Sequence, residues 1–135
     1  MEQKIPRWIE RLSVFEKALD RLDEVVRLSH QRTLNSFETD SLIKRFEFCF
    51  ELACKLLMSY ETEAGILQIL GSRDAVRHAM EMSLIENGEV WMDMIDSPNQ
   101  TSHVYDEEMA RDVMDEIINT YYPVMRVLQE SMVEI

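Results

Sequence analysis

The chain has 135 residues and a formal net charge of −12, and 46% of its residues are apolar. This length corresponds to a single domain, which we place at residues 1–135. Three glycines and three prolines allow few turns, which argues against a β-sandwich or a β-barrel. The apolar fraction argues against disorder. No apolar run approaches the length of a membrane span, so no membrane association is expected.

The acidic residues are concentrated in the second half of the chain. Residues 1–60 carry ten Lys/Arg and ten Asp/Glu, whereas residues 61–135 carry four Lys/Arg and 16 Asp/Glu. A basic face that neutralises the phosphates of a nucleic-acid duplex is therefore hard to assemble. The acidic half is typical of a surface that provides solubility or binds a basic protein partner.

Two long helices are predicted in the first half of the chain. Pro6 suits the first turn of the first helix, whose apolar stripe ends near residue 30. The polar residues 31–36 form a connection, and the second helix runs from about residue 37 or 39 to 62. This second helix is apolar around most of its circumference, which predicts burial from more than one direction. In so short a chain a second subunit can provide that cover, so we expect a homodimer.

Three further helices are predicted in the second half. A short helix spans about residues 73–83 with Ser72 as its N-cap, and another runs from an Asn87 cap to Ile95. The last helix is capped by Asp106, and Pro123 is expected to kink it or to end its regular part. The predicted fold is therefore all-α, an up-and-down bundle of three long and two short helices.

A polar segment at residues 96–106 interrupts the helical periodicity and holds the densest set of reactive side chains. A histidine is the natural acid or base near neutral pH, and a tyrosine is both a hydrogen-bonding group and a modification site. The alternative is structural, with His103 and Tyr105 capping helices and packing at a loop. The candidate residues of this segment are Asn99, Thr101, Ser102, His103, Tyr105 and Asp106.

Two charged pairs on the predicted helices are further candidates for a binding site. Arg73 and Arg77 are four residues apart on one helical face, so both guanidinium groups can bind the same phosphate. The alternative is that they form ion pairs with the surrounding acids. Glu51 and Lys55 are also four residues apart, on a very apolar helix. They either stabilise that helix or line a cleft.

No metal or cofactor is expected from the sequence. None of the three histidines follows a glutamate at the spacing that di-metal carboxylate bundles use. Cys49 and Cys54 are five residues apart and point to different sides of a helix, so they are expected to be core residues. Free buried thiols are typical of a reducing compartment, and we expect the cytoplasm. No glycine-rich phosphate loop is present.

Three separate runs of the chain resemble one family. They are FEFCFELACKLL (46–57), GSRDAVRHAMEMSLIENGEVWMDMI (71–95) and NQTSHVYDEE (99–108). They closely resemble small bacterial HEPN-domain proteins called nucleotidyltransferase substrate-binding proteins. The resemblance covers nearly the whole chain and implies a homodimeric helical bundle whose partner is a minimal nucleotidyltransferase. In that family such pairs act as toxin and antitoxin. The HEPN member is a metal-independent ribonuclease, which the partner silences by adding a nucleotide to a tyrosine.

The catalytic motif of that family is an arginine, four to six residues, a histidine and commonly a tyrosine two positions later. His103 and Tyr105 match the last two positions, but Pro98 stands where the arginine belongs. The motif arginine stabilises charge on the phosphate, which proline cannot do. The resemblance therefore implies a non-catalytic binding subunit, in which Tyr105 can still accept a nucleotide.

The alternatives are a ribonuclease toxin and a plain structural bundle without a ligand. The ribonuclease would use His103 and an arginine from outside the motif, such as Arg73 or Arg77, with RNA as its ligand.

Overall fold

The structure of the protein is a computed structural model that describes residues 5–96 and 107–135. Its helices are α1 (Arg7–Gln31), α2 (Ser36–Glu63), α3 (Ser72–Glu81), α4 (Gly88–Ile95), α5 (Glu107–Glu116), η2 (Ile117–Tyr121) and α6 (Tyr122–Val133). Because α5, η2 and α6 follow one another without a break, they form the third long helix. The prediction of an all-α bundle of three long and two short helices is confirmed, and no strand occurs among the described residues.

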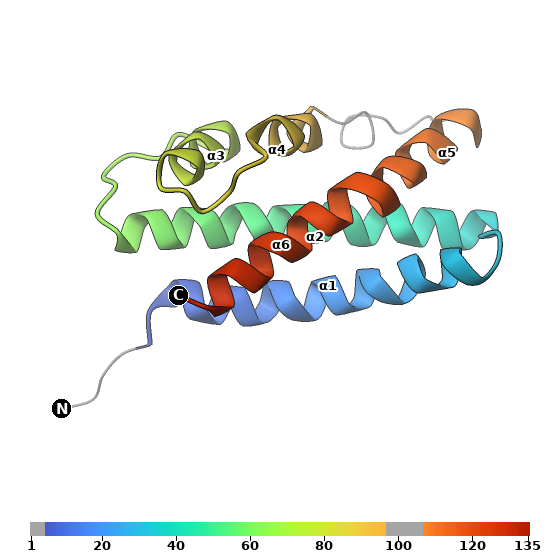
Figure 1. The fold of residues 1–135 in the computed structure, drawn as a ribbon, viewed down its shortest axis with the longest axis horizontal. Coiled ribbons are helices and arrows are strands. Elements are labelled where there is room, and N and C mark those ends of the chain that lie inside the picture. The colour runs from blue at the N-terminus through green and yellow to red at the C-terminus, as the bar shows by residue number, and fades with distance from the viewer. Residues whose placement is uncertain (1–4, 97–106) are drawn as a thin grey trace.

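The helices form two layers (Figure 1). The antiparallel helices α1 and α2 pack along their length as a hairpin. Helices α3 and α4 lie next to each other on one side of α2 and are seen nearly end-on, and the α5–η2–α6 run crosses the hairpin obliquely to contact both of its helices. None of the helices within the described ranges combines the length and apolarity needed to cross a membrane.

The core lies around α2, which is covered on two sides by its own chain. Phe46 of α2 is fully buried and stacks on Tyr121 of η2, with ring centroids 5.3 Å apart. On the same helix Phe50 approaches Trp91 of α4 at 6.3 Å. The broad apolar surface of α2 is therefore explained largely within one chain, because α1 covers one side and the helices of the second layer cover another. The homodimer expected from that surface stays a prediction.

The start of α2 is fixed by a capping box whose first residue, Asn35, lies within the predicted connection. The side chain of Asn35 accepts a hydrogen bond from the backbone N–H of Glu38 at 2.9 Å, and the Glu38 carboxylate accepts the Asn35 N–H at 2.9 Å. Arg32 adds a hydrogen bond to the same carboxylate at 2.8 Å. The Arg32 hydrogen bond, together with that from the Asn35 N–H, lowers the pKa of Glu38 to about 2. The helix consequently begins at Ser36, earlier than the sequence pattern predicted.

The predicted cap of α3 is wrong by one residue. Gly71, with a φ of +135°, occupies the N-cap position, and Ser72 is the first helical residue. Serine normally caps by bonding a backbone N–H, but Ser72 instead hydrogen-bonds the Cys54 side chain on α2. Asn87 does occupy the N-cap position of α4 as predicted, although its side chain makes no capping hydrogen bond.

Pro123 does not end the last helix but is accommodated by a π-helical turn. The ring of a proline within a helix clashes with the carbonyl four residues earlier, here that of Asn119. The chain widens before the proline, and the Tyr122 N–H bonds the Ile117 carbonyl five residues back. The prediction of a disturbance at Pro123 is correct, and the disturbance takes the form of a π turn.

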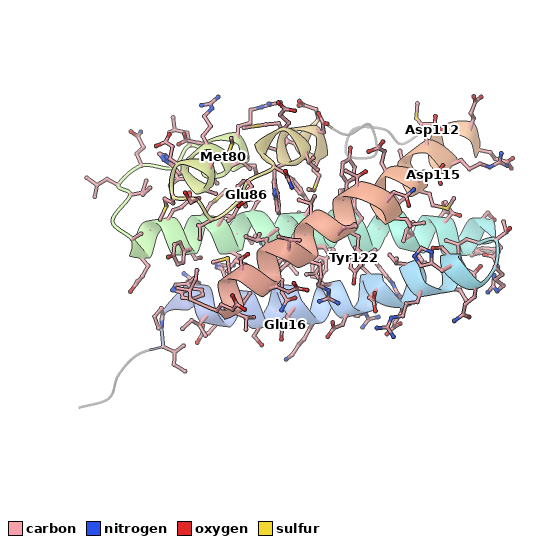
Figure 2. All side chains as sticks on the ribbon, in the orientation of Figure 1. Glu16, Met80, Glu86, Asp112, Asp115 and Tyr122 are labelled. Carbon is pink, nitrogen blue, oxygen red and sulfur yellow. The ribbon has the colours of Figure 1, made fainter. Side chains whose placement is uncertain are left out.

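Polar side chains join α6 to α1 beside this turn. The Tyr122 hydroxyl donates to Asp23 at 2.8 Å and accepts from Arg126 at 3.1 Å, while Arg126 also contacts Asp20 at 2.9 Å. Gln129 donates to Glu16 at 2.7 Å. Figure 2 shows Tyr122 beside α1, with Glu16 nearer the amino-terminal end of that helix. These contacts fix the position of α6 along α1.

One carboxyl group is buried in the core at the end of α2. The Glu61 side chain has an exposed fraction of 0%, and neither of its oxygens has a hydrogen-bond partner among the described residues. Burial, with a smaller contribution from the nearby Asp74, raises the pKa of Glu61 from 4.5 to about 8. Glu61 is therefore protonated at neutral pH, because an unpaired buried charge is costly.

The raised pKa of Glu61 predicts that stability declines as the pH rises. In the unfolded chain the carboxyl ionises near pH 4.5, whereas in the folded chain it stays protonated to about pH 8. The free energy of unfolding should therefore fall between about pH 5 and 8, by a few kcal/mol at about 1.4 kcal/mol per pKa unit. Glu61→Gln should remove this decline, as measured by urea unfolding at pH 5, 6.5 and 8.

A matched control is Glu63→Gln, which removes an exposed carboxyl from the end of the same helix. This variant should keep the decline of the wild type. Equal pH dependence in the wild type and in Glu61→Gln would contradict a protonated, buried Glu61.

Candidate functional site

The predicted reactive segment lies almost entirely outside the described residues. Asn99, Thr101, Ser102, His103 and Tyr105 fall in the range 97–106, as do Pro98 and the expected helix cap at Asp106. The described chain stops at Asp96, the C-cap of α4, and resumes at Glu107, the first residue of α5. The structure therefore defines the elements on both sides of the segment.

A guanidinium from α3 contacts the residue at which the segment begins. Arg73 forms an ion pair with the Asp96 carboxylate, although the two residues are 23 positions apart. Both side chains are about half exposed, at 51% and 58%. An exposed pair of this kind contributes about 0–1 kcal/mol to stability.

Arg73 and Arg77 line the same hollow, which lies between the start of α3 and the end of α4. Its volume is about 340 Å³. Gly71 has no side chain that could cap α3, so backbone N–H groups of the first turn and the positive end of the helix dipole add to the two guanidinium charges. The lining residues are Leu70, Gly71, Ser72, Arg73, Asp74, Arg77 and Ile95.

One acid opposes these positive charges within the hollow. The Asp74 carboxylate accepts the backbone N–H of Leu70 at 2.9 Å and lies 3.5 Å from His78 Nε2. These contacts hold it at the edge where the preceding loop meets α3. The hollow is thus of mixed charge, with two arginines and one aspartate.

The other predicted residues lie away from this hollow. Glu51 and Lys55 are exposed on α2 and form no ion pair with each other in the described part of the chain. Cys49 and Cys54 are free and buried, as predicted. Burial raises the pKa of Cys49 to about 12 and that of Cys54 to about 11, so neither thiol is reactive at neutral pH. Residues 5–96 and 107–135 contain no group of three or more side chains that could hold a metal ion.

The sequence did not reveal Asp96 as the partner of Arg73. Both residues are charged and of opposite sign, but nothing in their spacing indicates that α3 and α4 bring them together. The only available signal was the scarcity of bases in this half of the chain, where four Lys/Arg stand among 16 acids.

The described residues thus form an all-α bundle with an arginine-lined hollow at the end of α4, and a His–x–Tyr sequence follows that helix in the chain. A family model described as "Nucleotidyltransferase substrate binding protein like" matches residues 10–134. The chain belongs to this HEPN-like family.

Two relatives illustrate the similarity. "Probable ribonuclease HepT" of Haemophilus influenzae is 30% identical over 118 residues, which cover 78% of this chain and 81% of that protein. A crystal structure of a Thermus thermophilus protein matches with a TM-score of 0.75 and 29% identity, covering 86% of this chain and 96% of the other.

The weak pairing of Arg73 with Asp96 can be tested by a double-mutant cycle of Arg73→Gln and Asp96→Asn. We expect a coupling energy of at most about 1 kcal/mol in urea unfolding, because both side chains are half exposed. The coupling should shrink further when roughly half-molar NaCl screens the two charges. A coupling above about 2 kcal/mol would show that the pair holds α4 in place and is not freely exchangeable.

Proposed function

We propose that this chain is the non-catalytic, substrate-binding partner of a nucleotidyltransferase. The observation that carries the proposal is Pro98, which stands where the family motif has an arginine, in a chain that matches the family model over residues 10–134. Without that guanidinium, the charge that develops on a phosphate during RNA cleavage has no partner within the motif. The proposed partner is a nucleotidyltransferase because the family is described as nucleotidyltransferase substrate-binding proteins.

Tyr105 is the proposed acceptor of the transferred nucleotide. Its phenolic oxygen would form a bond to the α-phosphorus of a nucleoside triphosphate as the bond to pyrophosphate breaks. The partner enzyme would take the phenolic proton. The hollow lined by Arg73 and Arg77 is proposed to hold a phosphate group beside this segment, in exchange for the Asp96 carboxylate. Asn99, Thr101 and Ser102 would supply hydrogen bonds to the same ligand.

A ribonuclease is the second candidate, and the 30% identical relative named as a probable ribonuclease favours it. His103 would transfer the proton, and Arg73 or Arg77 would replace the missing motif arginine. The acidic character of the second half of the chain opposes RNA binding, because nucleic-acid affinity depends on neutralised phosphates.

A homodimer is proposed to form through the side of α2 that its own chain leaves open. Phe48 has an exposed fraction of 55% on this helix, and Phe37 near its start is also exposed. Lys44, Glu51 and Lys55 share the exposed side of α2, and their opposite charges can pair across a twofold axis. The interface would have an aromatic centre and a charged rim.

The acceptor role is tested with the purified chain, labelled ATP and a minimal nucleotidyltransferase of the class that the family description names. We expect a stable complex and a mass increase on the peptide that carries Tyr105, and no label on Tyr105→Phe. The same preparation should not cleave RNA. Label on a peptide that lacks Tyr105 would contradict the choice of acceptor, and absence of any complex would contradict the partner role.

RNA cleavage by the wild type would instead support the ribonuclease. In that case expression should arrest growth, and His103→Ala should abolish both effects, as should either Arg73→Gln or Arg77→Gln, whichever arginine replaces the missing one.

The dimer is tested with Phe48→Asp, which places a charge at the centre of the proposed interface. We expect light scattering to change from the mass of a dimer to that of a 16.0 kDa monomer. Because Phe48 is more than half exposed in the monomer, the melting temperature at low protein concentration should hardly change. Exposed Val14→Asp on α1 is the matched control and should leave the mass unchanged.

A further inference from the structure

A second hollow lies between the end of α3 and the first turns of α4. Its volume is about 500 Å³, and it is lined by Met80, Gly88, Glu89, Met92 and Asp93. Two of these five residues are methionines and two are acids. Because Met80 and both acids are exposed, small solutes reach the hollow from the solvent.

The sulfur of Met80 is sheltered by the backbone of α4. A Cβ atom placed on Gly88 would lie 2.0 Å from the Met80 Sδ and 2.6 Å from its Cε, so the thioether packs directly on this glycine. Although Met80 has an exposed fraction of 45%, one side of its sulfur is therefore covered.

The sulfur of Met92 lies beside a positive charge. The Arg73 Nη1 is 4.0 Å from the Met92 Sδ, and Nη2 of the same guanidinium bonds the Asp96 carboxylate. Met92 and Asp96 are four residues apart and share one face of α4, so a single guanidinium spans both. A thioether is a weak hydrogen-bond acceptor, and the carboxylate is consequently the principal partner of Arg73.

Peroxides oxidise a methionine thioether to its sulfoxide. The sulfur lone pair attacks one oxygen of hydrogen peroxide, and an S–O bond forms as the O–O bond breaks. The departing oxygen takes the proton of the transferred oxygen and leaves as water. The sulfur loses two electrons, which the peroxide gains. During this step positive charge develops on the sulfur and negative charge on the departing oxygen.

The surroundings of Met92 match both of these developing charges. The Arg73 guanidinium is placed to stabilise the departing oxygen, whereas Glu89 and Asp93 add negative charge around the sulfur. Neither acid forms an ion pair within the described ranges. Charges that are already in place where charge develops lower the barrier of a reaction.

We propose that Met92 is a site of oxidation by peroxides, and that its sulfoxide takes the Arg73 guanidinium from Asp96. A sulfoxide oxygen is polar and accepts hydrogen bonds better than a thioether. Because the Met92 sulfur is only 4.0 Å from Nη1, an oxygen on the Arg73 side of this sulfur lies within hydrogen-bond distance. The competing pair with Asp96 is half exposed and weak. Methionine sulfoxide reductases reverse the change.

The oxidation acts on the arginine that contacts Asp96, the last described residue before 97–106. A change in phosphate binding by the hollow with Arg77 rests on the proposed function. The oxidation of Met92 and the release of Asp96 do not depend on it.

The order of oxidation tests the proposal. The full chain is labelled with ¹³C at its methionine methyl groups and treated with hydrogen peroxide, and the signals are assigned through Met80→Leu, Met92→Leu and Met109→Leu. We expect Met92 to be oxidised before Met80 and Met109, which are 45% and 39% exposed, although Met92 is only partly exposed. Exposure alone predicts the reverse order. A mass increase of one oxygen on the peptide that carries Met92 identifies the product.

The role of the guanidinium is tested with Arg73→Gln. This variant should slow the oxidation of Met92 by at least about threefold, a smaller effect than the loss of an oxyanion-hole donor because the site is open to solvent. Arg111→Gln removes an exposed arginine of α5 that does not line the hollow, and it should leave the rate unchanged. An unchanged methyl spectrum before peroxide is added confirms that each variant is folded.

The exchange of partners is followed through the ¹H–¹⁵N signals of the Arg73 guanidinium, assigned with Arg73→Gln. Asp96→Asn should shift these signals in the reduced protein. After oxidation the same substitution should no longer shift them, because the sulfoxide has replaced the carboxylate.

Three outcomes would overturn the proposal. These are oxidation of Met80 or Met109 before Met92, equal rates for Met92 in Arg73→Gln and Arg111→Gln, or an equal shift by Asp96→Asn before and after oxidation. None of them concerns the labelling of Tyr105 by the partner, so the two proposals fail separately.

Discussion

The burial of α2 between two parts of its own chain is the constraint on which the other positions depend. Phe46 packs against Tyr121 of η2, which continues α5, while Phe50 lies beside Trp91 of α4. The helices on both sides of residues 97–106 are therefore packed against the same central helix, α2. Each aromatic pair of this kind contributes about 0.5–1.5 kcal/mol beyond the burial of its area. The end of α4 and the α5–η2–α6 run are thereby held against one core, so the described residues on both sides of 97–106 have fixed positions.

The helix ends on the two sides of residues 97–106 differ in charge for a simple structural reason. The arginines of α3 lie on the outer side of a short helix whose N-cap has no side chain, so the backbone adds to their positive charge. At the start of α5, by contrast, Glu107 and Glu108 stand in the first helical turn, where acids are favoured. The end of α4 therefore lies beside two arginines, whereas α5 begins with two acids.

The helices could be predicted from the sequence because their apolar positions recur with the helical period, and this signal is local. The caps were harder to predict, since Ser72 looks like an N-cap but turns toward Cys54 on another helix. The two-sided burial of α2 was also predicted, but a periodic pattern does not show whether the same chain or a second chain provides the cover. The Arg73–Asp96 pair depends on how α3 packs beside α4, which no spacing within either helix encodes.

The ends of the described chain have a practical consequence. The start of α1 and the C-terminus lie at one end of the long axis, whereas the α1–α2 connection and the start of α5 lie at the other (Figure 1). An affinity tag, a fluorophore or a fused protein joined near either of these two points is therefore directed away from the end of the bundle at which α5 begins. Immobilising the molecule through such a fusion leaves the opposite pole open to solvent and to approaching macromolecules.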